Sequence, residues 1–439
     1  PFGWFTHPAV QKFQDGDDQT SNYGTLDIIK ALEWVNNNIS LFGGDPENIT
    51  IFGESAGGHN VLSLLVSKQA RGMFNKAISM SGYTTSISLQ DSYKPLNNSS
   101  ISNYSSQNVV NSLLSKYDKD KKIRIDDLSQ VRKFLLSLPA DHFYSFYADR
   151  PSYEEIPLLT NDGIVIPKIG LKNSLSKKEH VTIVPTIAGS NRDEVKLWLG
   201  TARYFVDLEY SFIGSILNIP KVKLIDKNSF EAFNFYRSKA WQLRGVDDPL
   251  NSLYKAGNSE LYAYRYDWDD HRSLIIADFK KLIGAAHATE IPLLTGNMDL
   301  VGGYPLSDFI YPPSISKRYL SKNMMLFWTN FAKNGNPGMS TNSVSWNSYI
   351  SNDNFHNYLI LDSKKNLKMK SKKLTFAYLS SQLEKDTRLT ELEKCVVLLQ
   401  MYTFVGNDIY DENIKNYKND CNRNESEKFL KDNASYVEY

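Results

Sequence analysis

The chain is poor in cysteine, in long apolar runs and in net charge, and each shortage excludes a class of protein. Only two cysteines, Cys395 and Cys421, occur in 439 residues, so neither a disulfide-dense scaffold nor a cysteine-based metal cluster is expected. No apolar run approaches the roughly 18 to 20 residues that a membrane-spanning helix needs. Fifty basic and 49 acidic residues leave a net charge of +1, which argues against a dedicated nucleic-acid binder.

What is present is a core-forming composition and one informative motif. Hydrophobic residues make up 41% of the chain, enough to bury a large core. The segment 49–52 is a short β-branched run, Gly53-Glu54-Ser55-Ala56-Gly57 follows it, and residues 56–68 carry apolar residues at helical spacing. A strand, a glycine-framed serine and a helix start form the nucleophile elbow of a serine hydrolase. Gly53 and Gly57 are expected to permit the tight turn that exposes Ser55.

A longer stretch around this motif resembles a known family. The segments NYGTLDIIKALEWVNNNISLFGGDPENITIFGESAGG (22–58) and FNKAISMSG (74–82) are similar to the carboxylesterase and cholinesterase family, the type B carboxylesterases. The resemblance implies an α/β-hydrolase fold with a mostly parallel central sheet and helices on both faces. Residues 25–39 are expected to form an amphipathic helix that leads into the elbow strand.

The start of the chain suggests that part of the family's fold lies elsewhere. The chain begins at Pro1, without a methionine, at what resembles a mid-domain strand. We therefore expect a fragment whose N-terminal strands are missing, together with the glycine-rich loop that supplies most of the family's oxyanion hole. Within the chain, only the amide of Ala56 is assigned to that role. The compartment stays open, and both secretion and a periplasmic location fit this expectation.

We expect residues 1–439 to form a single, N-terminally truncated α/β-hydrolase domain. Helical insertions are expected around 95–150 and 200–255, and a helical tail over 374–439. The two cysteines of the tail either form one local disulfide or remain free thiols. The lysine-rich run 364–373 is interpreted as a solvated face or loop.

The acid of a catalytic triad should follow the serine, just after a strand. Residues 181–189 have the composition of a strand, and Asp193 and Glu194 follow it. The resemblance selects Glu194, because family members place the triad glutamate in a turn of the type G-x-x-x-D-E. Val195 departs from the glycine that many members carry at the next position.

The base must come from the histidines beyond Glu194, which are His271, His287 and His356. His271 lies among charged residues, like a solvated turn, and His356 precedes the expected strand 358–361 in an asparagine-rich loop. His287 has small neighbours that would let its ring approach other loops. The family's histidine stands in a segment of the type H-x-x-E-[IL]-P, so the resemblance also selects His287.

The predicted function is carboxylic ester hydrolysis through an acyl-enzyme on Ser55, with His287 as general base and acid and Glu194 orienting it. Glu54 would add a negative field beside the nucleophile. A small-molecule ester is the expected partner. Neither a metal nor an organic cofactor is expected, and the oligomeric state stays open. Aromatic residues between Trp198 and Trp241 would either line a substrate gorge or fill the core.

Two other functions remain open. Some relatives of this superfamily are catalytically silent binding or adhesion proteins, which typically lack a triad residue, whereas this chain has all three. The same three residues would also serve a hydrolase of amides, carbamates or glycerides, because the leaving group is selected by the shape of the pocket.

Overall fold

The computed structural model describes residues 2–93, 105–120, 122–148, 159–209, 221–301, 306–352, 355–403 and 421–433. The chain forms two compact units. Unit 1 comprises residues 1–46, 62–74 and 84–182, and unit 2 comprises residues 47–61, 75–83 and 183–439. Helix α3 (Ala56–Val66) begins in unit 2 and ends in unit 1. All of the predicted site residues belong to unit 2.

Unit 2 is built on a seven-stranded sheet in the order β1-β2-β5-β8-β10-β11, with β9 added against β10. The first five strands of that order pair in parallel, and β9 and β11 pair with β10 in antiparallel fashion. This is the mostly parallel sheet that the sequence predicted. The strands are β1 (Thr50–Glu54), β2 (Lys76–Met80), β5 (Thr186–Asn191), β8 (Leu261–Tyr266), β9 (Ile350–Asn352), β10 (Phe355–Leu361) and β11 (Lys368–Lys372).

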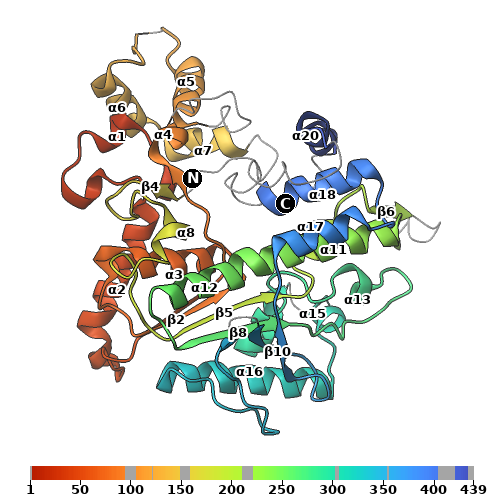
Figure 1. The fold of residues 1–439 in the computed structure, drawn as a ribbon. Helices are drawn as coiled ribbons and strands as arrows, with labels where there is room; N and C mark the ends of the chain where they lie inside the picture. The colour runs from red at the N-terminus through yellow and green to blue at the C-terminus, as the bar shows by residue number, and fades with distance from the viewer. Residues whose placement is uncertain are drawn as a thin grey trace. The chain divides into compact units, whose positions relative to one another are not determined.

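Helices cover both faces of this sheet (Figure 1). On one face, α16 (Ile315–Asn334) packs Met324, Phe327 and Phe331 against the alternating tyrosines of β8. On the other face lie α11 (Lys227–Gln242) and α12 (Asp248–Lys255), which Figure 1 shows on the opposite side of the strands from α16. The expected fold class is therefore confirmed. It places the C-terminal ends of the parallel strands at one edge, where α/β proteins build their sites.

A π-helical turn, η6 (Leu243–Asp247), joins α11 to α12. Gly245 lies in this turn, and a Cβ added there would come within 2.2 Å of the carbonyl oxygen of Gly82. Just before the turn, Trp241 donates its indole N–H to the Ser81 carbonyl at 3.1 Å. Asp247, the last residue of the turn, accepts a hydrogen bond from Tyr349 at 2.9 Å. The π turn thus packs directly against the loop that follows β2.

The remaining elements of unit 2 surround the sheet and end in a helical tail. A disulfide joins Cys395 in α18 (Glu391–Thr403) to Cys421, just before α20 (Arg423–Asp432). The sequence left open whether these two cysteines form a disulfide or remain free thiols, and the structure has the disulfide. The remaining elements are α9 (Lys196–Leu199), β6 (Val206–Glu209), β7 (Lys221–Leu224), α13 (Phe279–Leu282), α14 (Ile291–Thr295), η7 (Met298–Val301), α15 (Leu306–Ile310), α17 (Phe376–Glu384), α18 (Glu391–Thr403) and α20 (Arg423–Asp432).

Unit 1 is mainly helical and has its own apolar core, in which Phe5, Val109 and Val131 are buried. The elements of unit 1 are η1 (Phe2–Trp4), α1 (Pro8–Gln11), η2 (Gly16–Gln19), α2 (Tyr23–Asn38), η3 (Ile39–Phe42), η4 (Lys68–Ala70), β3 (Ile87–Ser88), α4 (Leu89–Tyr93), α5 (Ser106–Tyr117), α6 (Leu128–Ser137), α7 (Ala140–Ala148), β4 (Thr160–Asn161) and α8 (Leu171–Ser174).

Several local expectations need correction. The strand expected at the start is wrong, because Phe2–Trp4 forms a 3₁₀ helix. His356 lies within β10 rather than in a loop. Part of the lysine run forms the edge strand β11, whose lysines are exposed, so the run is a solvated face on a strand.

The division into one domain with insertions stays a prediction. Residues 95–104, 121 and 149–150 of the first expected insertion, 210–220 of the second, and 404–420 and 434–439 of the tail lie outside the described residues. Among the residues that the structure describes, no helix has the length and apolar character to cross a membrane.

Candidate active site

Ser55 occupies the turn between β1 and α3 in a left-handed conformation, with φ at +59°. A non-glycine residue rarely adopts this conformation, and such strain concentrates at functional sites. A Cβ on Gly53 would come within 2.5 Å of the Gly57 backbone, whereas a Cβ on Gly57 would meet nothing within 4 Å. The glycine that the turn requires is therefore Gly53. Because β1 and α3 approach so closely there, the Ser55 side chain is held on a sharp corner.

Ala56 is the first residue of α3. Amide groups in the first turn of a helix have no acceptor within the helix, and the helix dipole adds partial positive charge there. The side of the turn next to Ser55 can therefore stabilise an anion. Ala56 itself is exposed.

Glu194 lies three residues beyond the end of β5 and is fully buried. Its Oε1 accepts hydrogen bonds from the Ser81 hydroxyl and the Asn191 amide, both at 2.7 Å. Its Oε2 lies 2.7 Å from Nδ1 of His287. Both carboxylate oxygens therefore have fixed partners, and one of them orients the histidine ring.

Asp193, the neighbouring acid, has different partners. Its Oδ2 accepts hydrogen bonds from Arg192 at 2.7 Å and from the Ala285 amide at 3.0 Å. Its Oδ1 accepts one from Asn234 at 2.7 Å. Burial raises the pKa of Asp193, but the charges of Arg192 and Lys196 and the hydrogen bonds from Arg192 and the Ala285 amide together outweigh that effect, and the pKa is lowered. Asp193 therefore holds loops together, while Glu194 contacts the histidine.

His287 is buried in the loop that precedes α14. Its backbone amide donates to the Glu194 carbonyl at 3.1 Å, which adds a second link between the two residues. Its Nε2 lies 3.2 Å from Oε1 of Glu54, the residue before Ser55. The rings of Trp198 and Trp241 lie 5.1 and 4.7 Å from the imidazole, measured between centroids. The imidazole thus bridges Glu194 and the elbow between two indole rings.

The structure records no hydrogen bond between Ser55 and His287 within the described ranges. Instead, Nε2 of His287 faces the carboxylate of Glu54. Catalytic hydrogen bonds are often long or poorly aligned in proteins without a bound substrate.

Three carboxylic acids surround His287: Glu194 and Glu290 are buried, and Glu54 is partly buried. Burial raises the pKa of Glu54, opposed by the charge of His287 and reinforced by that of Glu194. Burial also raises the pKa of Glu290, which lies close to the other two. For His287, burial disfavours the imidazolium, but the pairing with Glu194 and the charge of Glu54 outweigh it and raise the pKa to about 9. The site therefore stabilises an imidazolium, the form that His287 takes after accepting a proton.

Some neighbours of the site were not predicted. Ser81, Asn191 and Glu290 lie in the site because of tertiary contacts, and Asn191 donates to the Glu290 carboxylate at 2.5 Å. Only their positions at strand ends or near His287 could have indicated them. The interpretation of His271 as a solvated turn is wrong. It is buried, and its Nε2 lies 2.7 Å from the Gly284 carbonyl, in the segment that leads to His287.

The described part of the chain holds no group of three or more His, Cys, Asp or Glu side chains arranged to bind a metal ion. The carboxylates near His287 form hydrogen bonds with other side chains: Glu194 with His287 and Ser81, and Glu290 with Asn191.

Comparison with known proteins identifies the family. A model of the carboxylesterase family matches residues 2–242 and 245–378. The chain belongs to the carboxylesterase family. Among curated members, carboxylesterase 1E of Rattus norvegicus is 30% identical over 352 residues, which cover 74% of this chain and 59% of that protein. Para-nitrobenzyl esterase of Bacillus subtilis (strain 168) is 27% identical over 371 residues, covering 83% and 67%.

Solved carboxylesterase structures share the fold. The carboxylesterase EST55 of Geobacillus stearothermophilus superimposes with a TM-score of 0.57 at 21% identity, covering 87% of this chain and 72% of that one. A PNB esterase gives a TM-score of 0.57 at 23% identity. The chain spans 59% of the length of the rat carboxylesterase 1E.

Proposed function

We propose that the protein containing this chain hydrolyses carboxylic esters through an acyl-enzyme intermediate on Ser55. The observation that carries the proposal is the contact of Nδ1 of His287 with buried Glu194, with Nε2 facing the elbow. A base oriented by a third group beside a nucleophile is the general signature of covalent catalysis. Membership of the carboxylesterase family supports the same reaction.

In the proposed reaction, His287 accepts the proton of Ser55 as Oγ attacks the ester carbonyl, and then donates it to the leaving alcohol. Water repeats the attack and releases the acid. Glu194 holds the proton on Nδ1, so that Nε2 is free to accept. The Ala56 amide donates to the oxyanion, and preorganised donors of this kind are worth roughly 10²- to 10³-fold in rate each.

The proposed substrate is a small-molecule ester. The indole rings of Trp198 and Trp241 stack at 5.9 Å between centroids beside His287. Trp241 is buried and Trp198 is partly exposed. The ring of Trp198 offers an apolar surface next to the reacting groups, which suits an alkyl or aromatic substituent better than a charged one. The relatives' names support this class, since they include para-nitrobenzyl esterase.

A fluorophosphonate probe tests the proposal, because it forms a covalent adduct only with an activated serine. We expect peptide mass spectrometry to find the adduct on Ser55, and expect p-nitrophenyl esters of short acids to be hydrolysed. The measurement should be made on this chain and on any longer protein that contains it. A folded whole protein that gave neither adduct nor ester hydrolysis would support the silent binding function instead.

A Glu54→Gln substitution tests the electrostatics of the site. The rate should depend on neutral His287, so it should rise with pH through the pKa of that residue. Removing the negative charge of Glu54 lowers that pKa, because a carboxylate within a few ångströms raises a histidine pKa by about 1 to 3 units. The rise should therefore move to lower pH by about 1 unit or more, as measured by kcat/KM against pH.

The control is Glu260→Gln, which removes an exposed carboxylate elsewhere in unit 2. It should leave the pH profile unchanged. A Glu54→Gln profile that coincided with that of the unmodified protein would show that Glu54 does not contact His287 during the reaction.

A further inference from the structure

His271 is a buried titratable residue that the proposed reaction does not use. It lies in the loop that follows β8 and is 5% exposed. Its Nε2 lies 2.7 Å from the carbonyl oxygen of Gly284, and its Nδ1 contacts the carbonyl oxygen of Ile310. Ile310 is the last residue of α15, and Gly284 lies three residues before His287. The imidazole of His271 therefore joins the segment that carries the proposed base to α15.

Gly284 is the least constrained point of the segment that leads to His287. It adopts a left-handed conformation with φ at +54°, and a Cβ there would come within 2.5 Å of Oδ2 of Asp193. A larger residue would displace that carboxylate, and glycine has more backbone freedom than any other residue. Hydrogen bonds to the backbone must therefore hold this part of the segment in place.

The peptide group between Gly284 and Ala285 is held at both ends. Its N–H donates to Oδ2 of Asp193 at 3.0 Å, and its carbonyl faces Nε2 of His271. The C=O and N–H of a planar trans peptide group point in opposite directions, so the two contacts restrain this plane from opposite sides. Without His271, the plane would be held from the side of Asp193 alone.

The next part of the segment is restrained by the turn that carries Glu194. The Ala286 carbonyl accepts a hydrogen bond from Asn191 at 2.7 Å, and the His287 amide donates to the Glu194 carbonyl at 3.1 Å. Both contacts fix the segment relative to the end of β5. The contact from His271 comes from another part of the chain, so it fixes the segment relative to α15.

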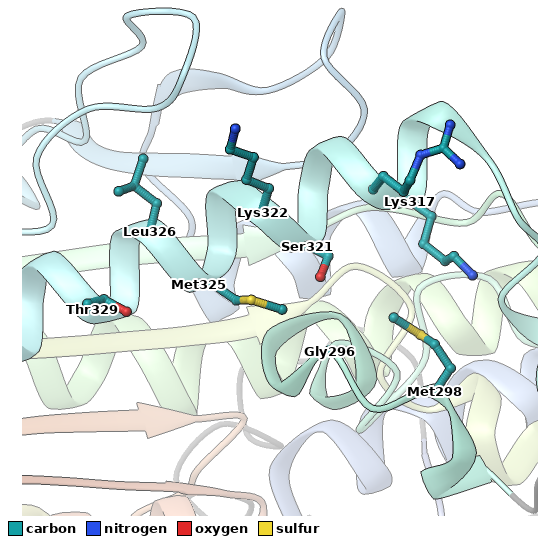
Figure 2. A pocket seen from close by; sticks show the side chains of 9 residues that line it. Gly296, Met298, Lys317, Ser321, Lys322, Met325, Leu326 and Thr329 are labelled. Atoms are coloured by element: carbon teal, nitrogen blue, oxygen red, sulfur yellow. The ribbon is translucent and has the colours of Figure 1, made fainter.

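Downstream of the proposed base, the chain is anchored to α16. It continues through α14 to Gly296, beside the surface pocket drawn in Figure 2. The figure shows Ser321 of α16 pointing toward this turn, and the Ser321 hydroxyl donates to the Leu293 carbonyl at 2.7 Å. With this end fixed, the position of His287 depends on how the Gly284 end is held.

The ring of His271 is itself firmly placed and neutral. It makes edge-to-face contacts with Trp268 and Tyr311, at centroid distances of 5.2 and 6.0 Å. Burial lowers its pKa, and the two carbonyl contacts and the charges of Asp269 and Asp270 oppose that shift without reversing it. The ring is therefore neutral near pH 7. A neutral imidazole has one N–H, so it donates to one of the two carbonyls at a time.

The neutral ring should carry its proton on Nε2. Gly284 is buried, whereas Ile310 is partly exposed. A buried carbonyl that loses its donor pays its full desolvation penalty, whereas water can replace a donor at a partly exposed one. The tautomer that donates to the Gly284 carbonyl is therefore favoured.

We propose that His271 is a positioning residue for His287. It donates Nε2–H to the Gly284 carbonyl and fixes the plane of that peptide group, and this sets where the imidazole of His287 lies between Glu194 and the elbow. The proposal rests on the proposed ester hydrolysis, in which His287 is the base. A misplacement of reacting groups by about 1 Å can cost roughly 100-fold in rate.

Two substitutions of His271 separate the two contacts of its ring. The amide nitrogen of asparagine follows Cβ and Cγ, as Nδ1 of histidine does, and that of glutamine lies one atom further out, as Nε2 does. His271→Asn should therefore keep a donor for Ile310 and lose the donor for Gly284, and His271→Gln should do the reverse. We expect His271→Asn to lower kcat by about 10- to 100-fold with little change in KM, and His271→Gln to keep kcat within about threefold.

Thermal unfolding distinguishes positioning from a merely structural role. Each variant can make one of the two carbonyl contacts, so both should lose similar stability while only His271→Asn loses activity. His180→Asn, in unit 1, makes the same chemical change away from this segment and should leave kcat unchanged. Equal losses of kcat in the two His271 variants would overturn the proposal, and so would full activity in His271→Asn.

A measurement without substrate separates this proposal from the proposed function. The NMR resonance of the His287 Nδ1–H proton reports the pairing of that ring with Glu194. It should persist in the unmodified protein and in His271→Gln, and broaden by exchange with water in His271→Asn. If it did so while the unmodified protein gave neither fluorophosphonate adduct nor ester hydrolysis, the proposed function would fail and the positioning of His287 would stand. An identical resonance in all three proteins, with the unmodified protein active, would have the opposite meaning.

Discussion

Replacing Ser55 by alanine should lower ester hydrolysis by about 10⁴- to 10⁶-fold, because nothing else in the elbow can form the acyl-enzyme. The loss should appear in kcat, with the fluorophosphonate adduct lost as well. The melting temperature should change little, because the left-handed conformation at φ +59° is unfavourable by a similar free energy for alanine and for serine. Measurements of kcat, probe labelling and thermal unfolding check these three expectations.

Ser343→Ala is the matched control for this change. Ser343 is exposed and has φ at +65°, so the substitution repeats the same chemical change in the same backbone conformation away from the site. It should retain full activity. If Ser55→Ala retained more than about one part in a hundred of the activity while folded, Ser55 would not be the nucleophile, because triad serines are worth far more.

Replacing Glu194 by glutamine should lower kcat by about 10⁴-fold, the size of the loss when a triad carboxylate becomes an amide in serine proteases. The structure gives the reason. Oε1 of Glu194 receives hydrogen bonds from Ser81 and Asn191, so the glutamine oxygen should occupy that position. The NH₂ group would then point at Nδ1 of His287 and force the proton to Nε2, where it blocks proton transfer from Ser55.

Glu290→Gln provides the contrast for that prediction. Glu290 is also buried near His287, but its raised pKa favours the neutral form near pH 7, so an amide resembles it in charge. We expect this variant to lose less than about tenfold, because it leaves the tautomer of His287 unchanged. The proton resonance of Nδ1–H, observed by NMR, should persist in Glu290→Gln and disappear in Glu194→Gln. Persistence in both would contradict the proposed role of Glu194.

The parts of the fold that could be predicted from sequence are those with local causes. The run from the elbow strand through Ser55 to α3 carries its own strand composition, turn glycine and helical spacing, so its structure follows from neighbours in the chain. The helix expected over 25–39 is α2 (Tyr23–Asn38). The strand expected over 358–361 lies within β10 (Phe355–Leu361). In each case periodicity alone is sufficient.

The parts that could not be predicted depend on distant partners. His271 was interpreted as solvated because charged residues flank it, but its ring is buried against carbonyls from other segments. Ser81 reaches Glu194 across 113 positions of sequence. The stretch from Trp198 to Trp241 contains many aromatic residues, of which Trp198 and Trp241 themselves lie against His287. Nothing in the local sequence distinguishes these two tryptophans from the other aromatic residues. The assignments of Ser55, Glu194 and His287 to catalytic roles stay predictions until the variants are measured.

The π turn between α11 and α12 has a consequence for how this family member can change its length. A π turn contains one more residue than an α turn, and each residue rotates a helix by about 100°. Deleting one residue near Gly245 would restore regular geometry but would rotate Trp241 away from Ser81 or Asp247 away from Tyr349. A substitution leaves the helical register unchanged, whereas a single-codon deletion here would misalign two buried contacts at once.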